Sequence, residues 1–156
     1  MRLKPDYALA HNNLGLALQE TGRLQDAISH YEQALRLEPG YVEALNNLGV
    51  ALAEMGAERE ALEHYERALQ LRPDSALLRY NYGNTLFRAG RIDQAIGQYD
   101  MAVRINPDFV QAHYNWGIAL EQAGQSKEAI AHYEEALRLK PDFAEAQKAL
   151  ARLRAP

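Results

Sequence analysis

The sequence predicts an all-α fold made of repeated helix–turn–helix units. A triplet of asparagine, a large apolar residue and glycine recurs at intervals of 34 residues. Its copies are Asn13-Leu14-Gly15, Asn47-Leu48-Gly49, Asn81-Tyr82-Gly83 and Asn115-Trp116-Gly117. Proline keeps the same interval, at Pro5, Pro39, Pro73, Pro107 and Pro141. A strict period of this length indicates a repeat architecture in which neighbouring units share one continuous core.

Each repeat contains two helical stripes separated by a glycine. In the first copy the first stripe is Ala10, Leu14, Ala17 and Leu18, spaced as one face of a helix, and the second is Ala27, Ile28, Tyr31, Ala34 and Leu35. The breaks between the stripes fall at Gly22, Gly56, Gly90 and Gly124. Proline ends the second helix, because it disfavours α geometry in the residue before it. We expect an aspartate after the proline to accept from free N–H groups of the next helix, at Asp6, Asp74, Asp108 and Asp142.

Small residues predict where the helices approach each other closely. Gly15, Gly49, Gly83 and Gly117 lie inside predicted first helices, where glycine costs roughly 1 kcal/mol relative to alanine. A cost repeated at one position implies contact with a neighbouring helix. The large side chains expected to fill the adjacent space are Tyr31, Tyr65, Tyr99 and Tyr133.

The chain is predicted to form a single array over residues 1–156. Four repeats are expected at 8–41, 42–75, 76–109 and 110–143, preceded at 1–7 by the tail of an earlier second helix. Residues 144–156 form a more polar capping helix, with Ala149 and Ala151 in place of the asparagine and glycine of the triplet. Because residues 1–6 resemble 137–142, we expect that the chain was cut from a longer array.

Composition and motifs exclude several classes of function. The formal net charge of −4 argues against nucleic acid as a partner, and the absence of cysteine excludes disulfides and thiolate metal sites. No apolar run approaches the length of a membrane span or a signal-peptide core. We therefore expect no membrane contact, and we expect a cytoplasmic location. The serines form no nucleophile motif, and there is no phosphate-binding loop. We expect no catalytic residue and no cofactor.

The histidines are expected to be packing residues. His30, His64 and His132 occupy one repeat position on successive second helices. Such helices lie roughly 8–10 Å apart, too far for equivalent side chains to share a metal readily. We therefore expect no metal site, and a structural role also for His11 and His113.

The register of Leu14, Gly15, Leu18, Ala27, Tyr31, Ala34 and Pro39 resembles the tetratricopeptide repeat, over nearly the whole chain. The sequence departs from that pattern at the family's tryptophan position and at its first tyrosine. The resemblance implies a right-handed α-solenoid whose first helices line a concave groove. The groove asparagines also resemble those in the repeats of O-linked N-acetylglucosamine transferase and of kinesin light chain.

Two interpretations of Asn13, Asn47, Asn81 and Asn115 remain open. The resemblance places one of them in the groove per repeat, where an amide can bond a peptide N–H and C=O together. Repeats about 10 Å apart would present one asparagine to about every third residue of an extended strand. In the other interpretation, each amide ties adjacent first helices together.

The remaining groove positions indicate the character of a ligand. Glu20, Glu43, Glu54 and Glu121 outnumber Arg88, which favours a neutral or basic extended segment. Selective contacts are expected around Tyr80, Phe87, Arg88 and Tyr114, because aromatic residues and arginine are common anchors of interfaces. The other predicted contact residues are Asn12, Asn46 and Asn84. Sequence drift within the array is the alternative.

The sequence thus predicts a non-enzymatic interaction module that binds an extended peptide or protein segment in its groove. A structural segment that stacks end to end is the alternative, because Leu9, Ala10 and Leu14 would be uncovered in the first repeat. A third possibility is the substrate-recognition part of a larger glycosyltransferase.

Overall fold

The computed structural model describes residues 4–155, with only the backbone described for residues 4–6. Within this range the protein is all α, and its helices are α1 (Lys4–Glu20), α2 (Leu24–Leu37), α3 (Val42–Glu54), α4 (Glu58–Leu71), α5 (Ala76–Arg88), α6 (Ile92–Ile105), α7 (Val110–Gln122), α8 (Ser126–Leu139) and α9 (Ala144–Arg154). The expected tail of an earlier repeat at residues 1–7 lies partly outside the described residues. Residues 4–7 belong to α1, because proline is tolerated in the first turn of a helix.

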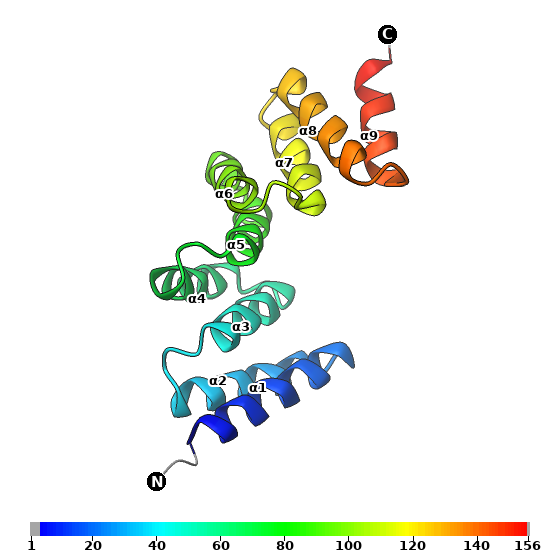
Figure 1. Ribbon diagram of the computed structural model, residues 1–156. Helices are drawn as coiled ribbons and strands as arrows, with labels where there is room; N and C mark the ends of the chain where they lie inside the picture. Colours follow the sequence, from blue (N-terminus) through cyan, green and yellow to red (C-terminus); the bar gives the residue numbers. More distant parts are fainter. Residues whose placement is uncertain (1–3, 156) are drawn as a thin grey trace. The chain divides into compact units, whose positions relative to one another are not determined.

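The chain divides into two compact units, Met1–Asp74 and Ser75–Pro156. Unit 1 contains α1–α4, and unit 2 contains α5–α9 (Figure 1). Within each unit, a first helix packs most extensively on the second helix of its own repeat and then on the second helix before it. The predicted all-α helical-repeat solenoid is confirmed as a fold class.

Glycine and tyrosine account for the tight packing inside each repeat. A Cβ atom on Gly117 would lie 2.5 Å from Cε1 of Tyr133, and one on Gly49 would lie 2.8 Å from Cζ of Tyr65. The corresponding tyrosines are almost completely buried in all four repeats: Tyr31, Tyr65, Tyr99 and Tyr133. The predicted close approach of the two helices is therefore confirmed, and the contact is between a bare backbone and an aromatic ring.

The predicted glycine breaks form the turns between first and second helices. Gly22, Gly56, Gly90 and Gly124 have φ between 73° and 81°. The N–H of Arg23 donates to the carbonyl of Leu18 at 2.9 Å, which closes the end of α1 as a Schellman motif. Glycine adopts this left-handed conformation without the steric cost that a side chain would add.

The expectation that aspartates cap the following helices is wrong where it can be examined. Asp74, Asp108 and Asp142 lie one residue before the N-cap, which is Ser75, Phe109 or Phe143. Only Ser75 makes a side-chain cap, accepting from the N–H of Leu78 at 3.3 Å, among the N-caps that the structure describes. Each helix begins one residue later than expected, and a cap must come from the N-cap residue itself. The side chain of Asp6 lies outside the described part of the chain.

One face of α1 is uncovered, although its equivalent in α3 is buried. Leu14 is 47% exposed, whereas Leu48 is 2% exposed. Ala10 and Ala17 are likewise exposed, and their counterparts Ala44 and Ala51 are 0% exposed. In unit 1, α3 packs against the preceding second helix α2. The face of α3 is therefore buried because α2 covers it, whereas no second helix covers the equivalent face of α1 within the described residues.

Candidate functional site

In unit 1, an asparagine amide connects consecutive first helices. Nδ2 of Asn47 on α3 donates to Oδ1 of Asn12 on α1 at 3.0 Å. Nδ2 of Asn46 donates to Oδ1 of Asn47 at 3.2 Å. Asn12 is 4% exposed, so this predicted contact residue serves the packing of α1 on α3.

Unit 2 contains a more extensive version of the same connection. Nδ2 of Asn115 on α7 donates to the hydroxyl of Tyr80 at 3.1 Å and to Oδ1 of Asn84 at 2.9 Å, both on α5. The same Asn84 oxygen accepts from the hydroxyl of Tyr99 at 2.8 Å. The ring of Tyr80 packs against Phe109, with centroids 4.8 Å apart. Tyr80, predicted as a ligand anchor, is thus held by protein contacts on both its ring and its hydroxyl.

The asparagine at the repeated position therefore points back to the preceding first helix. This holds for Asn47 and Asn115, and it is the second of the two interpretations that the sequence left open. Asn13 is exposed, and α1 has no preceding first helix within the described residues. Asn81 is half-buried on α5. Packing between first helices is thus one role of these amides, and contact with a ligand depends on atoms that packing leaves available.

Two pockets lie between consecutive first helices of unit 2. The first, the α5/α7 pocket, has a volume of about 240 Å³ and is lined by Asn84, Phe87, Arg88, Tyr99, Asn115 and Ile118. Four of these residues were predicted to contact a ligand: Asn84, Phe87, Arg88 and Asn115. The fold thus brings these predicted contact residues together from two helices that are distant in sequence.

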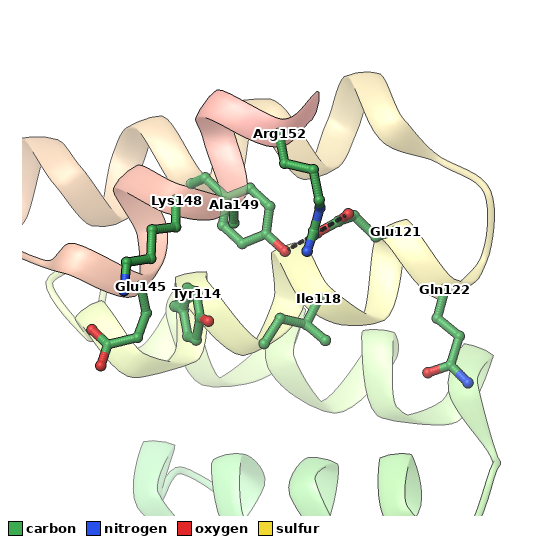
Figure 2. Close-up of a pocket in the computed structure, with 9 residues that line it drawn as sticks. Tyr114, Ile118, Glu121, Gln122, Glu145, Lys148, Ala149 and Arg152 are labelled. Atoms are coloured by element: carbon green, nitrogen blue, oxygen red, sulfur yellow. Dashed lines mark hydrogen bonds and ion pairs between the residues drawn. The ribbon is translucent and has the colours of Figure 1, made fainter. Parts of the chain in front are cut away.

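The second pocket, the α7/α9 pocket, has a volume of about 690 Å³. Its lining residues are Tyr114, Ile118, Glu121, Gln122, Tyr133, Glu145, Lys148, Ala149 and Arg152. Figure 2 shows Tyr114 and Ile118 on the α7 side and Lys148 and Arg152 on the α9 side. Ile118 lines both pockets, so the two are neighbours along α7.

The α7/α9 pocket includes residues that sequence reasoning missed. Glu145, Lys148 and Arg152 lie on α9, which was interpreted only as a cap. The signal was present in the repeat register, because Lys148 and Arg152 follow Tyr114 and Ile118 by 34 residues. Extending the groove positions into the last helix would have found them.

Glu121 is held from two directions. It accepts a hydrogen bond from the hydroxyl of Tyr133. Nη2 of Arg152 lies 2.8 Å from one of its carboxylate oxygens and 2.6 Å from the other. The side chain of Glu121 is 19% exposed and that of Arg152 is 67% exposed. The carboxylate is thus set into the pocket, whereas the guanidinium lies largely in solvent.

The charges of the two pockets are more balanced than the sequence analysis predicted. The basic residues that line the pockets are Arg88, Lys148 and Arg152, and the acidic ones are Glu121 and Glu145. In unit 1, Glu43 forms an ion pair with Arg72 at 2.9 Å, so one acid of the predicted excess already has a counterion. The prediction of a basic ligand therefore depends on individual contacts rather than on net charge.

The buried tyrosines remain hydrogen-bond donors. Burial raises the pKa of Tyr99, and burial together with the hydrogen bond to Glu121 raises the pKa of Tyr133. Burial and the charges of Glu54 and Glu20 raise the pKa of Tyr31 to about 12. Each ring therefore keeps its hydroxyl proton at neutral pH, and the acceptors on the first helices keep their partners.

Histidines of the first and second helices form stacked pairs, which the sequence analysis did not anticipate. The rings of His11 and His30 lie 5.2 Å apart, and those of His113 and His132 lie 5.5 Å apart. Trp116 stacks on His132 at 3.7 Å. Burial and the neighbouring His113 lower the pKa of His132 to about 4. No group of three or more potential metal ligands occurs in the described part of the chain.

The fold and these pockets define a class of protein, a helical-repeat scaffold with recesses between its first helices. Family models described as "Tetratricopeptide repeat" match residues 6–74, and a second such model matches residues 58–108, 80–144 and 114–155. The chain therefore belongs to the tetratricopeptide repeat family. Members of this family are protein-interaction scaffolds and are generally not enzymes.

Solved structures of similar fold support this assignment. A MamA crystal structure is 27% identical, with a TM-score of 0.83, and the match covers 89% of this chain and 81% of that chain. The pilF protein of Pseudomonas aeruginosa is 24% identical, with a TM-score of 0.89, over 96% of this chain and 68% of that chain. A chain of the APC/C hetero-tetramer Cut9–Hcn1 is 21% identical, with a TM-score of 0.88, over 95% of this chain and 30% of that chain. The last two show the fold alone.

None of the curated proteins matches the chain significantly. Among the helices that the structure describes, none has both the length and the apolar character needed to cross a membrane.

Proposed function

We propose that this protein binds an extended peptide segment along the first helices of unit 2. The observation that carries the proposal is the run of two adjacent pockets between α5, α7 and α9, joined at Ile118. Their walls combine apolar and aromatic surface, at Phe87, Ile118 and Tyr114, with a few amide and charged groups. Ligand sites in proteins have this composition, in which apolar walls supply affinity and sparse polar groups fix orientation.

The asparagines contribute to binding in divided roles. Asn84 uses its oxygen within the protein and Asn115 uses its nitrogen. No further hydrogen bond involves Nδ2 of Asn84 or Oδ1 of Asn115 within the described residues. We assign to Asn84 the carbonyl of the bound backbone and to Asn115 its N–H, since an amide offers both a donor and an acceptor. The expected series of asparagine contacts with the peptide backbone is thus made by pairs of amides from consecutive first helices, instead of by one amide per repeat.

A peptide-array screen of the full chain tests the proposal. Peptides that bind should lose at least about tenfold in affinity when Phe87→Ala or Tyr114→Ala removes an apolar wall, which corresponds to roughly 1.4 kcal/mol. Met101→Ala is the matched control, because Met101 is a 39% exposed apolar side chain on α6 that lines neither pocket. Equal binding by all the variants, or no binding peptide at all, would overturn the proposed function.

A second function is favoured by the uncovered face of α1. Ala10, Leu14 and Ala17 are exposed on α1, and the equivalent face of α3 is covered by a second helix. We propose as the alternative that this face stacks on a second copy of this chain. Sedimentation at increasing concentration separates this assembly function from peptide binding, since only assembly requires self-association.

A further inference from the structure

We propose that Glu121 recognises an arginine side chain of the bound segment, and that Arg152 occupies this point in the absence of ligand. The inference rests on the proposed function, because it names the side chain that an extended ligand would bring to the α7/α9 pocket. Arg152 is then an internal mimic of the ligand, and its contact with Glu121 competes with binding.

The geometry distinguishes a fixed partner from an exchangeable one. Glu121 is 19% exposed and accepts from Tyr133, a side chain that is 0% exposed, so its carboxylate is oriented by the core of the repeat. Arg152 is 67% exposed and comes from the last turn of α9. Water competes for the exposed guanidinium of this ion pair, and holding the long arginine side chain in place costs entropy. Arg152 can therefore leave Glu121 without disturbing the core.

Arginine is favoured over lysine because the existing partner of Glu121 is itself a guanidinium. In the present contact Nη2 of Arg152 alone donates to both oxygens of Glu121, at 2.8 and 2.6 Å. An arginine of the ligand is free to use two of its nitrogens against this carboxylate, whereas an ammonium acts as a point charge. Lys148 lines the same pocket and opposes a second cation. The pocket therefore selects a single arginine and disfavours a run of basic residues.

The neighbouring pocket sets the spacing of the motif. Ile118 lines both pockets, so a segment that places arginine beside Glu121 continues over Ile118 to the α5/α7 pocket. Phe87 and Ile118 there provide apolar surface for one large side chain. First helices lie roughly 8–10 Å apart, and an extended chain advances about 3.3 Å per residue. The expected ligand carries an apolar residue about three positions from the arginine.

A library of random dodecapeptides displayed on phage tests this inference on the full chain. We expect the wild-type protein to enrich arginine about three positions from a large apolar residue. Arg152→Gln should bind the selected arginine peptides at least about threefold more tightly, because the internal competitor is absent. Glu121→Gln retains an acceptor for Tyr133 but should lose the preference for arginine over citrulline. Arg154→Gln is the matched control, since Arg154 lies on α9 like Arg152, pairs with Glu134 of α8 and lines neither pocket.

The outcomes separate this inference from the proposed function. If selected peptides depend on Phe87 but show no arginine preference, the groove function stands and the role of Glu121 falls. If Arg152→Gln binds arginine peptides equally well or less well, the competition by Arg152 is overturned. If no peptide is selected by any variant, the proposed function itself fails. A melting temperature measured for each variant identifies loss of folding. If Glu121→Gln fails to fold, Glu121→Asp replaces it, because the shorter side chain keeps the charge but moves it away from the ligand and should also weaken the preference for arginine.

Discussion

Single residues of the repeated triplet have separable roles. Glycine permits contact with a tyrosine ring, which is a steric requirement imposed in every repeat, and this could be predicted from its position alone. The direction of the asparagine amide could not be predicted, because it depends on which polar atom of the preceding helix lies within 3 Å or so. The N-cap lies one residue after the aspartate that was expected to occupy it, because a period of 34 residues does not define where a helix begins.

The role of the asparagine can be tested by comparing two copies. Asn115→Ala should lower the free energy of unfolding by about 1–2 kcal/mol, because it removes two hydrogen bonds and leaves Asn84 with one partner fewer. Asn13→Ala should change it by no more than about 0.5 kcal/mol, because Asn13 is exposed. Urea unfolding of both variants provides the comparison. Equal losses would show that the amides do not stabilise the packing of the first helices.

The glycine contact gives a second test at this scale. Gly117→Ala should lower the free energy of unfolding by about 1–2 kcal/mol, since overpacking against Tyr133 exceeds the gain in helix propensity. Gly97→Ala should raise it by about 0.5–1 kcal/mol, because a Cβ there has no atom within 4 Å and α6 gains propensity. Thermal or urea unfolding measures both. The same sign for the two substitutions would contradict the assignment of Gly117 to a close contact.

At the scale of the helices, the order of the elements was predictable and their lateral contacts were less so. Apolar spacing, glycine and proline identify each helix because they act within a few residues. The pairing of His113 with His132 depends on how two helices face each other across a turn, and it had no local signal. Lys148 and Arg152 are hard to predict for a different reason, because α9 carries Ala149 and Ala151 in place of the asparagine and glycine that mark the other first helices.

The half-buried His132 of α8, which stacks on His113 of α7, should make the free energy of unfolding depend on pH. The pKa of His132 is about 4 in the folded protein and 6.5 for an unperturbed histidine, so the unfolded chain binds the proton more readily. Its contribution is complete above about pH 6.5 and is lost as the pH falls toward 4. His113 adds to this lowering, while Asp100 and Glu135 oppose it. The melting temperature should therefore fall between pH 7.5 and pH 5.

His132→Gln separates this effect from other titrations. The variant should lose less stability than the wild type over the same pH interval, because glutamine carries no titrating group. The comparison stops at pH 5 so that carboxylates contribute little. An unchanged pH dependence in the variant would mean that His132 does not carry the effect.

At the scale of the whole chain, the fold class followed from the period, whereas the division into two compact units did not. The boundary between Asp74 and Ser75 is preceded by Pro73, and this Pro-Asp sequence differs little from those at the other repeat junctions. Nothing local marks it as a boundary. The division reflects the sum of contacts on either side, which a repeated sequence pattern cannot express.

The open face of α1 gives the prediction that belongs to the whole chain. If this face mediates assembly, Leu14→Lys should lower the sedimentation coefficient at high concentration, because a charge replaces an apolar contact. Leu77→Lys is a suitable control, since Leu77 is 54% exposed on α5 and lies outside α1. A wild-type chain that sediments as a monomer at every concentration would overturn the assembly function.

The hydrogen bonds of the repeated asparagines run from a later helix to an earlier one. Asn47 finds its acceptor on α1, and Asn115 finds its acceptors on α5, so in both cases the donor follows the acceptor in the sequence. A ribosome releases the amino end first, and each acceptor is therefore exposed before its donor has been synthesised. Each new helix can thus complete its polar contacts on a surface that already exists, which favours folding in step with translation.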